Sequence, residues 1–164
     1  MQNINEIEEL IKLISKSRGF TAIIIGDGEE KKYYKGLVKK YNVQDKVFFI
    51  GKIPYLDLFQ YTLACDIGWL VIKGHGISNQ LALPNKLFEY GLAGIPTIAS
   101  DFSEMKDYIL KFKLGKAVAP NNISEHINAV NKLLKWSNSK VLIENVKNNC
   151  SWHSQEQKFI ELLN

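Results

Sequence analysis

Segments with helical periodicity alternate with short apolar runs along this chain, and this alternation constrains the fold more than any other feature. From Asn3 to Ser17, isoleucine and leucine recur every three or four residues, which predicts an amphipathic helix capped near Asn3 or Asn5. The next segment, "FTAIIIGDG", is a continuous apolar run that ends in Gly-Asp-Gly. Such a run is typical of a strand that is buried on both faces and followed by a turn.

The same alternation continues to the C-terminus. It predicts strands at "KVFFIG", "DIGWLVI", "PTIAS" and "GKAVAP", and helices at about Glu29–Tyr41, Pro54–Ala64, Pro84–Leu92, Ser103–Leu110 and Ser124–Trp136 and from Ser151 onward. Helices that alternate with buried strands form right-handed crossovers between parallel strands. The expected fold class is therefore α/β with a doubly wound, mostly parallel sheet, and one domain over residues 1–164 accounts for the chain.

Composition excludes several classes of protein. With 46% hydrophobic and 23% charged residues, the chain is typical of a globular domain, and its apolar runs are far shorter than the roughly 20 residues of a transmembrane helix. The start resembles no signal peptide, so we expect a cytoplasmic protein. The net charge of +4 is too small to indicate nucleic-acid binding. Cys65 and Cys150 are far apart in the sequence and are expected to be reduced thiols.

Two conspicuous sets of side chains are interpreted as structural. In "KKYYKGLVKK", Tyr33, Leu37, Val38 and Tyr41 recur at helical spacing, so the lysines are expected on the solvated face of an amphipathic helix. The tryptophans at positions 69, 136 and 152 are expected to pack in the core or between helices.

The loops that follow the strands are where a ligand is expected, because open parallel sheets bind ligands beyond the carboxyl ends of their strands. Four loops qualify: Gly26–Gly28, Gly51–Pro54, Lys73–Pro84 and Ser100–Glu104. The third is the longest, and it leads into a helix whose first amides are free and whose dipole favours an anion.

Lys86 and Glu89 stand on that helix, and each has two interpretations. Lys86 opposes the helix dipole unless an anion lies nearby, although it could equally be an ordinary solvated lysine. Glu89 could accept two hydrogen bonds from a ribose diol, or it could pair with Lys86 one turn earlier. The Gly-Asp-Gly turn lacks the full dinucleotide-binding pattern, and His75 has no neighbour at metal-ligand spacing.

Five blocks occur in an order that resembles a known family. They are "IIIGDGEE", "VQDKVFFIGKIP", "LFQYTLACDIGWLVI", "LPNKLFEYGLAGIPTIASD" and "CSWHSQEQKFIELL". Together they resemble the nucleotide-sugar-binding C-terminal domain of family-4 glycosyltransferases of the GT-B fold. The resemblance implies a Rossmann-like domain and retaining transfer of a hexosyl group from a UDP- or GDP-sugar, without a cofactor or metal. It also implies a place in polysaccharide or glycolipid biosynthesis, such as capsule or lipopolysaccharide, in the cytoplasm or peripherally on the inner face of the membrane.

The resemblance assigns roles to individual residues. Glu89 corresponds to the second glutamate of the Glu-x7-Glu pattern and would bond the ribose hydroxyls. The remaining donor-nucleotide positions are Gly26 and Gly28 in the first loop, Gly51, Lys52 and Ile53 beside the base, and the amides of Leu83, Asn85 and Lys86 beside the diphosphate. Leu81 stands where the first glutamate should be, so Ser78, Asn79 or Ala82 is expected to contact the donor sugar instead.

A second departure from the family is larger. Family members begin this domain with a strand that ends in Gly-Arg and is soon followed by Lys-Gly, and that strand lies in the middle of a sheet of order 3-2-1-4-5-6. Here the sequence begins at the following helix, and the N-terminal domain that would bind an acceptor glycan or glycolipid is absent as well. We therefore expect the central gap to be closed by rearranged strands or by a partner chain, which could be another copy.

Two alternative functions follow. The chain could be a non-catalytic remnant or subunit that docks a separate partner chain. A sugar-nucleotide 2-epimerase of the related fold would need carboxylates and a histidine around the sugar, and His75 alone argues against it.

Overall fold

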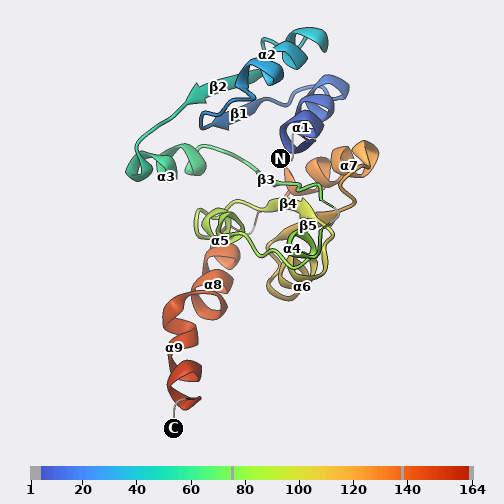
Figure 1. The fold of residues 1–164 in the computed structure, drawn as a ribbon. Helices are drawn as coiled ribbons and strands as arrows, with labels where there is room; N and C mark the ends of the chain where they lie inside the picture. Colours follow the sequence, from blue (N-terminus) through green and yellow to red (C-terminus); the bar gives the residue numbers. More distant parts are fainter. Residues whose placement is uncertain (1–4, 75, 138, 163–164) are drawn as a thin grey trace.

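The computed structural model describes residues 5–74, 76–137 and 139–162 and confirms the α/β fold class (Figure 1). In chain order, the elements are α1 (Asn5–Lys16), β1 (Ala22–Ile25), α2 (Lys31–Lys40), β2 (Val47–Gly51), α3 (Tyr55–Leu63), β3 (Gly68–Leu70), α4 (Ile77–Gln80), α5 (Asn85–Leu92), β4 (Thr97–Ser100), α6 (Ser103–Phe112), β5 (Gly115–Val118), α7 (Ile123–Leu133), α8 (Ser139–Asn149) and α9 (Trp152–Glu161).

Every strand and helix predicted from the sequence is present, and two helices were not predicted. The short α4 lies inside the long loop that follows β3. α8 lies between the two last predicted helices and buries Leu142 and Val146, which are one turn apart. Figure 1 shows α8 and α9 leading away from the strands toward the C-terminus.

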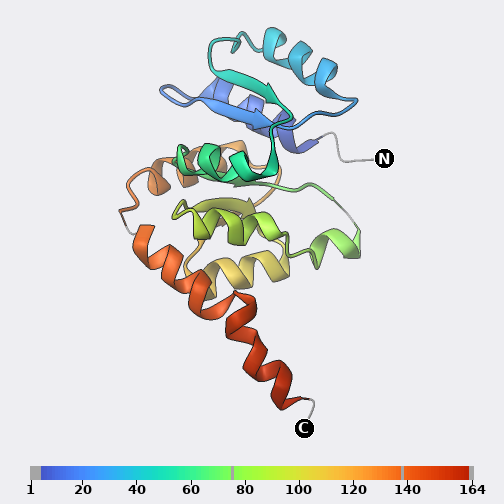
Figure 2. The same ribbon diagram turned by 90° about the vertical axis from the view of Figure 1, so that its left-hand side faces the viewer.

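The strands form two parallel sheets rather than one. One sheet has the order β1-β2 and the other the order β3-β4-β5. In Figure 2 the two sheets lie one above the other, with the arrows of β1, β2 and β4 pointing the same way. In the family order 3-2-1-4-5-6, β2 and β1 take the places of strands 3 and 2, and β3, β4 and β5 take those of strands 4, 5 and 6. The place of the family's strand 1, between β1 and β3, holds no described strand. The expectation that rearranged strands close the gap is wrong for the described residues, because no strand among them lies between β1 and β3.

Two hydrophobic clusters hold these layers together. The first joins α1, α2 and α7 to one face of both sheets and includes Ile11, Leu37, Val47, Ile98 and Val130. The second joins α5, α6 and α8 to the other face of the larger sheet and includes Leu87, Met105, Ile109 and Leu142. Each strand of the larger sheet is therefore covered on both sides, as a parallel sheet requires.

The smaller sheet is covered on one side only, which corrects the prediction that its strands are buried on both faces. Ala22 and Val47 are buried against the helices, whereas Ile23, Phe48 and Ile50 are 44%, 45% and 42% exposed. α3 follows β2 but buries none of its residues. A continuous apolar run indicates that both faces of a strand are apolar, but it does not show that both are covered.

Two further predictions about side chains need correction. In α2 the buried residues are Tyr34, Leu37 and Val38, whereas Tyr33 is 46% exposed and donates a hydrogen bond to Glu8. Trp152 is 69% exposed and contacts Phe159 of the same helix, rather than a core. The other two tryptophans pack against the clusters as predicted.

Candidate functional site

The loops that follow β1 and β2 meet at the carboxyl edge of the smaller sheet. The amide of Gly26 donates a hydrogen bond to the carbonyl of Gly51 at 2.8 Å. Both residues have positive φ, +133° and +85°, a region where residues with a Cβ are strained. Glycine at these two positions therefore lets the two loops close on each other, and Lys52 and Ile53 follow directly.

Three charged side chains, Asp27, Lys31 and Lys52, lie near this junction. Asp27 accepts a hydrogen bond from the amide of Gly28 at 3.0 Å and pairs with Lys31 at 3.3 Å. The hydrogen bond from Lys31, together with the Gly28 amide and the nearby charge of Lys52, lowers the pKa of Asp27. Lys31 and Lys52 thus stand near the same loop. Asp27 and Lys31 were not among the predicted site residues, although their spacing of four residues was visible in the sequence.

The long loop after β3 is held by a buried serine. The Ser100 hydroxyl donates a hydrogen bond to the carbonyl of Ile72 at 2.6 Å and accepts one from the amide of Ile72 at 2.7 Å. This side chain therefore satisfies the backbone of Ile72, two residues after β3, as a neighbouring strand would. Of the predicted sugar-binding residues farther along, Ser78 is exposed and Ala82 is half-buried. The side chain of Asn79 and the whole of His75 lie outside the described residues.

α5 begins where that loop ends. Pro84 precedes its first residue and supplies no side-chain cap, so the first amides of the helix, including those of Asn85 and Lys86, remain available at its positive end. Asn85 and Lys86 are exposed, and Leu83 packs against the second hydrophobic cluster. The helix thus presents its N-terminus from a fixed position.

Lys86 and Glu89 do not pair with each other. Among the described residues, no ion pair joins them, and Glu89 is half-buried. The charge of Lys86 acts on Glu6 of α1 instead: burial raises the pKa of Glu6, and Lys86 partly offsets that rise. The N-terminus of α1 therefore lies near the N-terminus of α5.

A buried ion pair ties α1 to the end of β3. Glu9, which is 4% exposed, accepts a hydrogen bond from Lys73 at 2.7 Å and another from Lys12 at 3.1 Å. Sequence analysis missed this group because glutamate and lysine in an amphipathic helix usually lie on its solvated face.

The predicted donor residues therefore fall into two groups. One group, at the ends of β1 and β2, contains Gly26, Gly28, Gly51, Lys52 and Ile53. The other, at α4 and α5, contains Ser78, Ala82, Leu83, Asn85, Lys86 and Glu89. Within the first group, Gly26 and Gly51 are hydrogen-bonded to each other, but no hydrogen bond or ion pair among the described residues joins one group to the other.

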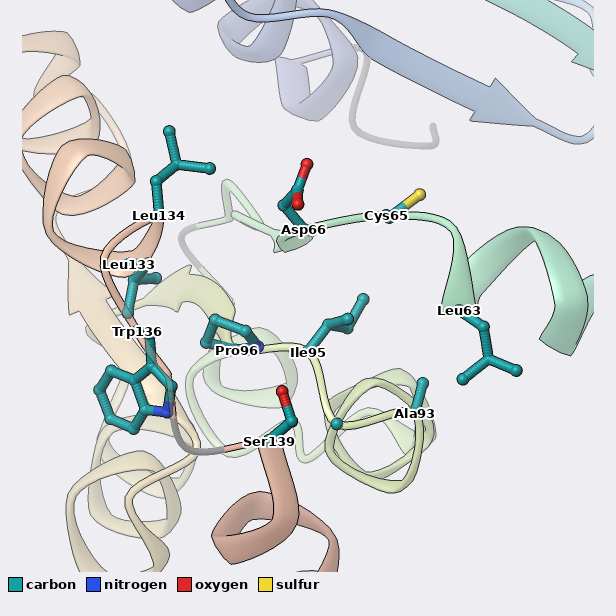
Figure 3. Close-up of a pocket in the computed structure, with 11 residues that line it drawn as sticks. Leu63, Cys65, Asp66, Ala93, Ile95, Pro96, Leu133, Leu134, Trp136 and Ser139 are labelled. Carbon is teal, nitrogen blue, oxygen red and sulfur yellow. The ribbon is translucent and has the colours of Figure 1, made fainter.

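The hollow in Figure 3 has a volume of about 220 Å³ and lies elsewhere. Asp66 and Pro96, which precede β3 and β4, line it together with Leu63, Leu134 and Trp136. These residues mark the amino ends of the strands, whereas the predicted site residues follow their carboxyl ends. None of the predicted site residues lines this hollow.

Two general properties concern the described residues only. No group of three or more His, Cys, Asp or Glu side chains among them is arranged to hold a metal ion. None of the described helices is long and apolar enough to span a membrane.

A comparison with family models identifies one family for this chain. A family model described as "Glycosyl transferases group 1" matches residues 1–149. Protein CapJ of Staphylococcus aureus is 28% identical over 147 residues, which cover 87% of this chain and 34% of CapJ.

Solved structures share the fold. The sucrose-phosphate synthase of Thermosynechococcus elongatus superposes with a TM-score of 0.75 at 20% identity, over 97% of this chain and 41% of that protein. Anabaena Alr3699/HepE, solved in complex with UDP, superposes with a TM-score of 0.72 at 19% identity, over 95% of this chain and 44% of that protein. The chain thus spans less than half the length of each of these proteins.

Proposed function

We propose that this chain, which belongs to the group 1 glycosyl transferases, is the donor-binding half of a retaining glycosyltransferase. Its donor would be a UDP- or GDP-sugar that carries a hexose, and its acceptor a glycan or glycolipid bound by a separate N-terminal domain. The setting would be polysaccharide or glycolipid biosynthesis at the cytoplasmic face of a membrane, with at most peripheral contact. HepE, a protein of similar fold, has been solved with UDP, which supports a uridine nucleotide as the first donor to test.

The N-terminus of α5 is the observation that carries this proposal. It has free amides, a lysine in its first turn and a half-buried glutamate one turn later, and the glutamate does not pair with that lysine. A diphosphate suits the amides and Lys86, because a helix N-terminus favours an anion. Ribose hydroxyls suit Glu89, because a carboxylate accepts two hydrogen bonds.

The proposed chemistry depends on stabilising a leaving group. When the bond between the sugar and the diphosphate breaks, negative charge grows on the diphosphate, and fixed amides and cations stabilise it. In this chain the amides of Leu83, Asn85 and Lys86 would do so. Gly51, Lys52 and Ile53 would lie beside the base, and Gly26 and Gly28 would contact another part of the donor nucleotide. Ser78, Asn79 or Ala82 would contact the sugar in place of the missing first glutamate. No resident metal is needed for these steps.

Titration with UDP and GDP tests the proposal directly. We expect calorimetry or NMR to show binding of at least one of them, and the absence of binding by both at millimolar concentration would refute a donor site in this chain. Glu89→Ala should weaken nucleoside diphosphates about tenfold, since two hydrogen bonds to a charged group are lost. The same variant should leave the affinity for inorganic pyrophosphate unchanged. Lys86→Ala should weaken both ligands, and Glu144→Ala, an exposed carboxylate on α8, is the matched control.

The second candidate function is a non-catalytic remnant or subunit that docks a separate partner chain. The interrupted sheet favours it, because β1 and β3 each keep one edge without a strand neighbour among the described residues. This candidate predicts no transfer and no donor hydrolysis by the chain alone. Activity that appears only after a partner is added would support it, and transfer by the chain alone would exclude it.

A further inference from the structure

Three glycines leave open space where the loops after β1 and β2 meet. Among the described residues, a Cβ added to Gly26 or to Gly28 would meet no atom within 4 Å beyond its chain neighbours. One added to Gly51 would meet only the Nζ of Lys31, at 3.8 Å. A flat group can therefore lie directly against the backbone at this carboxyl edge of the smaller sheet, which is where parallel sheets bind ligands.

Two charged side chains beside this space keep hydrogen-bonding capacity. Asp27 accepts the amide of Gly28 with Oδ1 at 3.0 Å, and its Oδ2 lies 3.3 Å from the Nζ of Lys31. A carboxylate has about four lone-pair sites, and a lysine ammonium has several N–H donors. Both side chains are partly exposed, so a ligand can reach them. Asp27 can accept a further hydrogen bond and Lys31 can donate one while their own contact is kept.

A phosphate does not suit this space. The amide of Gly26 already donates to the carbonyl of Gly51, and the amide of Gly28 donates to Asp27, so neither is free to bind an anion. The hydrogen bond from Lys31 lowers the pKa of Asp27, so its carboxylate is charged at neutral pH and repels a phosphate. The N-terminus of α5 suits the diphosphate better, which leaves the base as the part of a nucleotide that fits here.

The pair presents a hydrogen-bond acceptor beside a donor. Uracil and guanine have the complementary edge, in which a ring N–H lies next to a carbonyl. Cytosine and adenine have the opposite arrangement, in which a ring nitrogen without a proton lies next to an amino group. Their ring nitrogen would face the carboxylate of Asp27 and their amino group the ammonium of Lys31, so like would meet like.

We propose that Asp27 and Lys31 select the base of the donor, favouring uracil or guanine over cytosine and adenine. The base would lie against the three glycines, with its ring N–H donating to Asp27 and its carbonyl accepting from Lys31. This inference rests on the proposed function, because it needs a donor nucleotide at this edge of the sheet. It gives a role to two side chains, whereas the resemblance placed only Gly51, Lys52 and Ile53 beside the base.

Two matched pairs of nucleotides test this selection by calorimetry on the full 164-residue chain. UDP and CDP differ only at the edge that would face the pair, and inosine diphosphate (IDP) and ADP differ in the same way on a purine. We expect UDP and IDP to bind about tenfold more tightly than CDP and ADP, because the second member of each pair reverses both hydrogen bonds. GDP, measured beside UDP, distinguishes the two bases that share this edge.

Asp27→Asn tests the carboxylate itself. The amide oxygen of the new side chain can still accept from Gly28, while its NH2 group suits the ring nitrogen of cytosine. The ratio of the UDP and CDP affinities should therefore fall from about ten to about one. The ratio is measured because the lost negative charge affects all diphosphates alike. Asp45→Asn removes the same charge from an exposed residue before β2, at the opposite end of the smaller sheet, and should leave the ratio unchanged.

The outcomes separate this inference from the proposed function. If none of the nucleotides binds at millimolar concentration, the donor site is refuted and base selection falls with it. If nucleotides bind but the members of each matched pair bind equally, base selection alone is overturned. Lys31→Ala removes the donor and should lower the ratio of UDP to CDP affinity as Asp27→Asn does. A ratio that either variant leaves unchanged overturns the assignment to these two side chains.

Discussion

Neutralising Glu9 should destabilise this protein far more than neutralising its neighbour Glu8. Glu9 is 4% exposed and lies 2.7 Å from Lys73 and 3.1 Å from Lys12. In Glu9→Gln the two lysines lose their buried carboxylate, while a side chain of the same size remains. Breaking a fully buried ion pair costs roughly 3–5 kcal/mol. Because Lys73 and Lys12 keep some contact with water, we expect about 2–3 kcal/mol for this variant.

Glu8→Gln is the matched control. Glu8 pairs with the same Lys12 at 2.7 Å, but its side chain is 20% exposed against 5% for Glu9. A partly exposed pair of this kind contributes less than about 1 kcal/mol. Both variants keep the length of the original side chain, and Gln at position 8 can still accept the hydrogen bond from Tyr33, so the comparison sets a buried pair with two lysines against a partly exposed pair with one.

Urea unfolding followed by circular dichroism measures the difference. A double-mutant cycle with Lys73→Met should give a coupling energy of at least about 1 kcal/mol between Glu9 and Lys73. Raising the salt concentration should change the Glu8 effect more than the Glu9 effect, because buried charges are less screened. Equal losses for Glu8→Gln and Glu9→Gln would refute the argument that this pair joins α1 to β3 from a buried position.

Three further predictions concern other elements. Burial lowers the pKa of His126 below its usual value of 6.5, so the unfolded chain binds the proton more readily than the folded chain. The free energy of unfolding should therefore be full above pH 6.5 and fall as the pH drops below it. His126→Phe should flatten the dependence of the urea midpoint on pH. Gly115→Ala should cost at least about 3 kcal/mol, because a Cβ there would overlap the Thr97 carbonyl at a φ of +152°; a soluble variant of normal stability would contradict this. Asn122→Ala should cost about 1 kcal/mol, since its side chain caps α7 by accepting from the Glu125 amide at 3.1 Å, and Asn122→Ser should restore most of the loss.

The order of strands and helices could be predicted because it depends on local periodicity. β4 shows this best: "PTIAS" was predicted as a buried strand, and each residue of Thr97–Ser100 is buried. α8 was not predicted, because its two buried residues, Leu142 and Val146, lie among lysines and asparagines and form only a weak apolar stripe.

Contacts between distant segments could not be predicted in this way. The charge of Lys86 on α5 acts on Glu6 of α1, and nothing in the spacing of these two helices along the sequence indicates that they interact. The exposure of Phe48 could not be predicted for the same reason. A sequence pattern indicates which face of a strand is apolar, but it does not indicate whether a helix covers that face. For the candidate site, the sequence predicted the helix that carries Glu89, but not that Glu89 would be free of Lys86.

The division into two sheets also affects how the chain folds. Each sheet is built from one contiguous stretch, residues 22–51 for the smaller and 68–118 for the larger, so strand pairing within each requires only modest loop closure. The contact of α1 (Asn5–Lys16) with α7 (Ile123–Leu133) joins helices that lie on opposite sides of all the described strands in the sequence, so it carries a large entropy of closure. We therefore expect the two strand pairings to form early and the docking of α1 to limit the folding rate, with the largest kinetic effects from substitutions that weaken this docking.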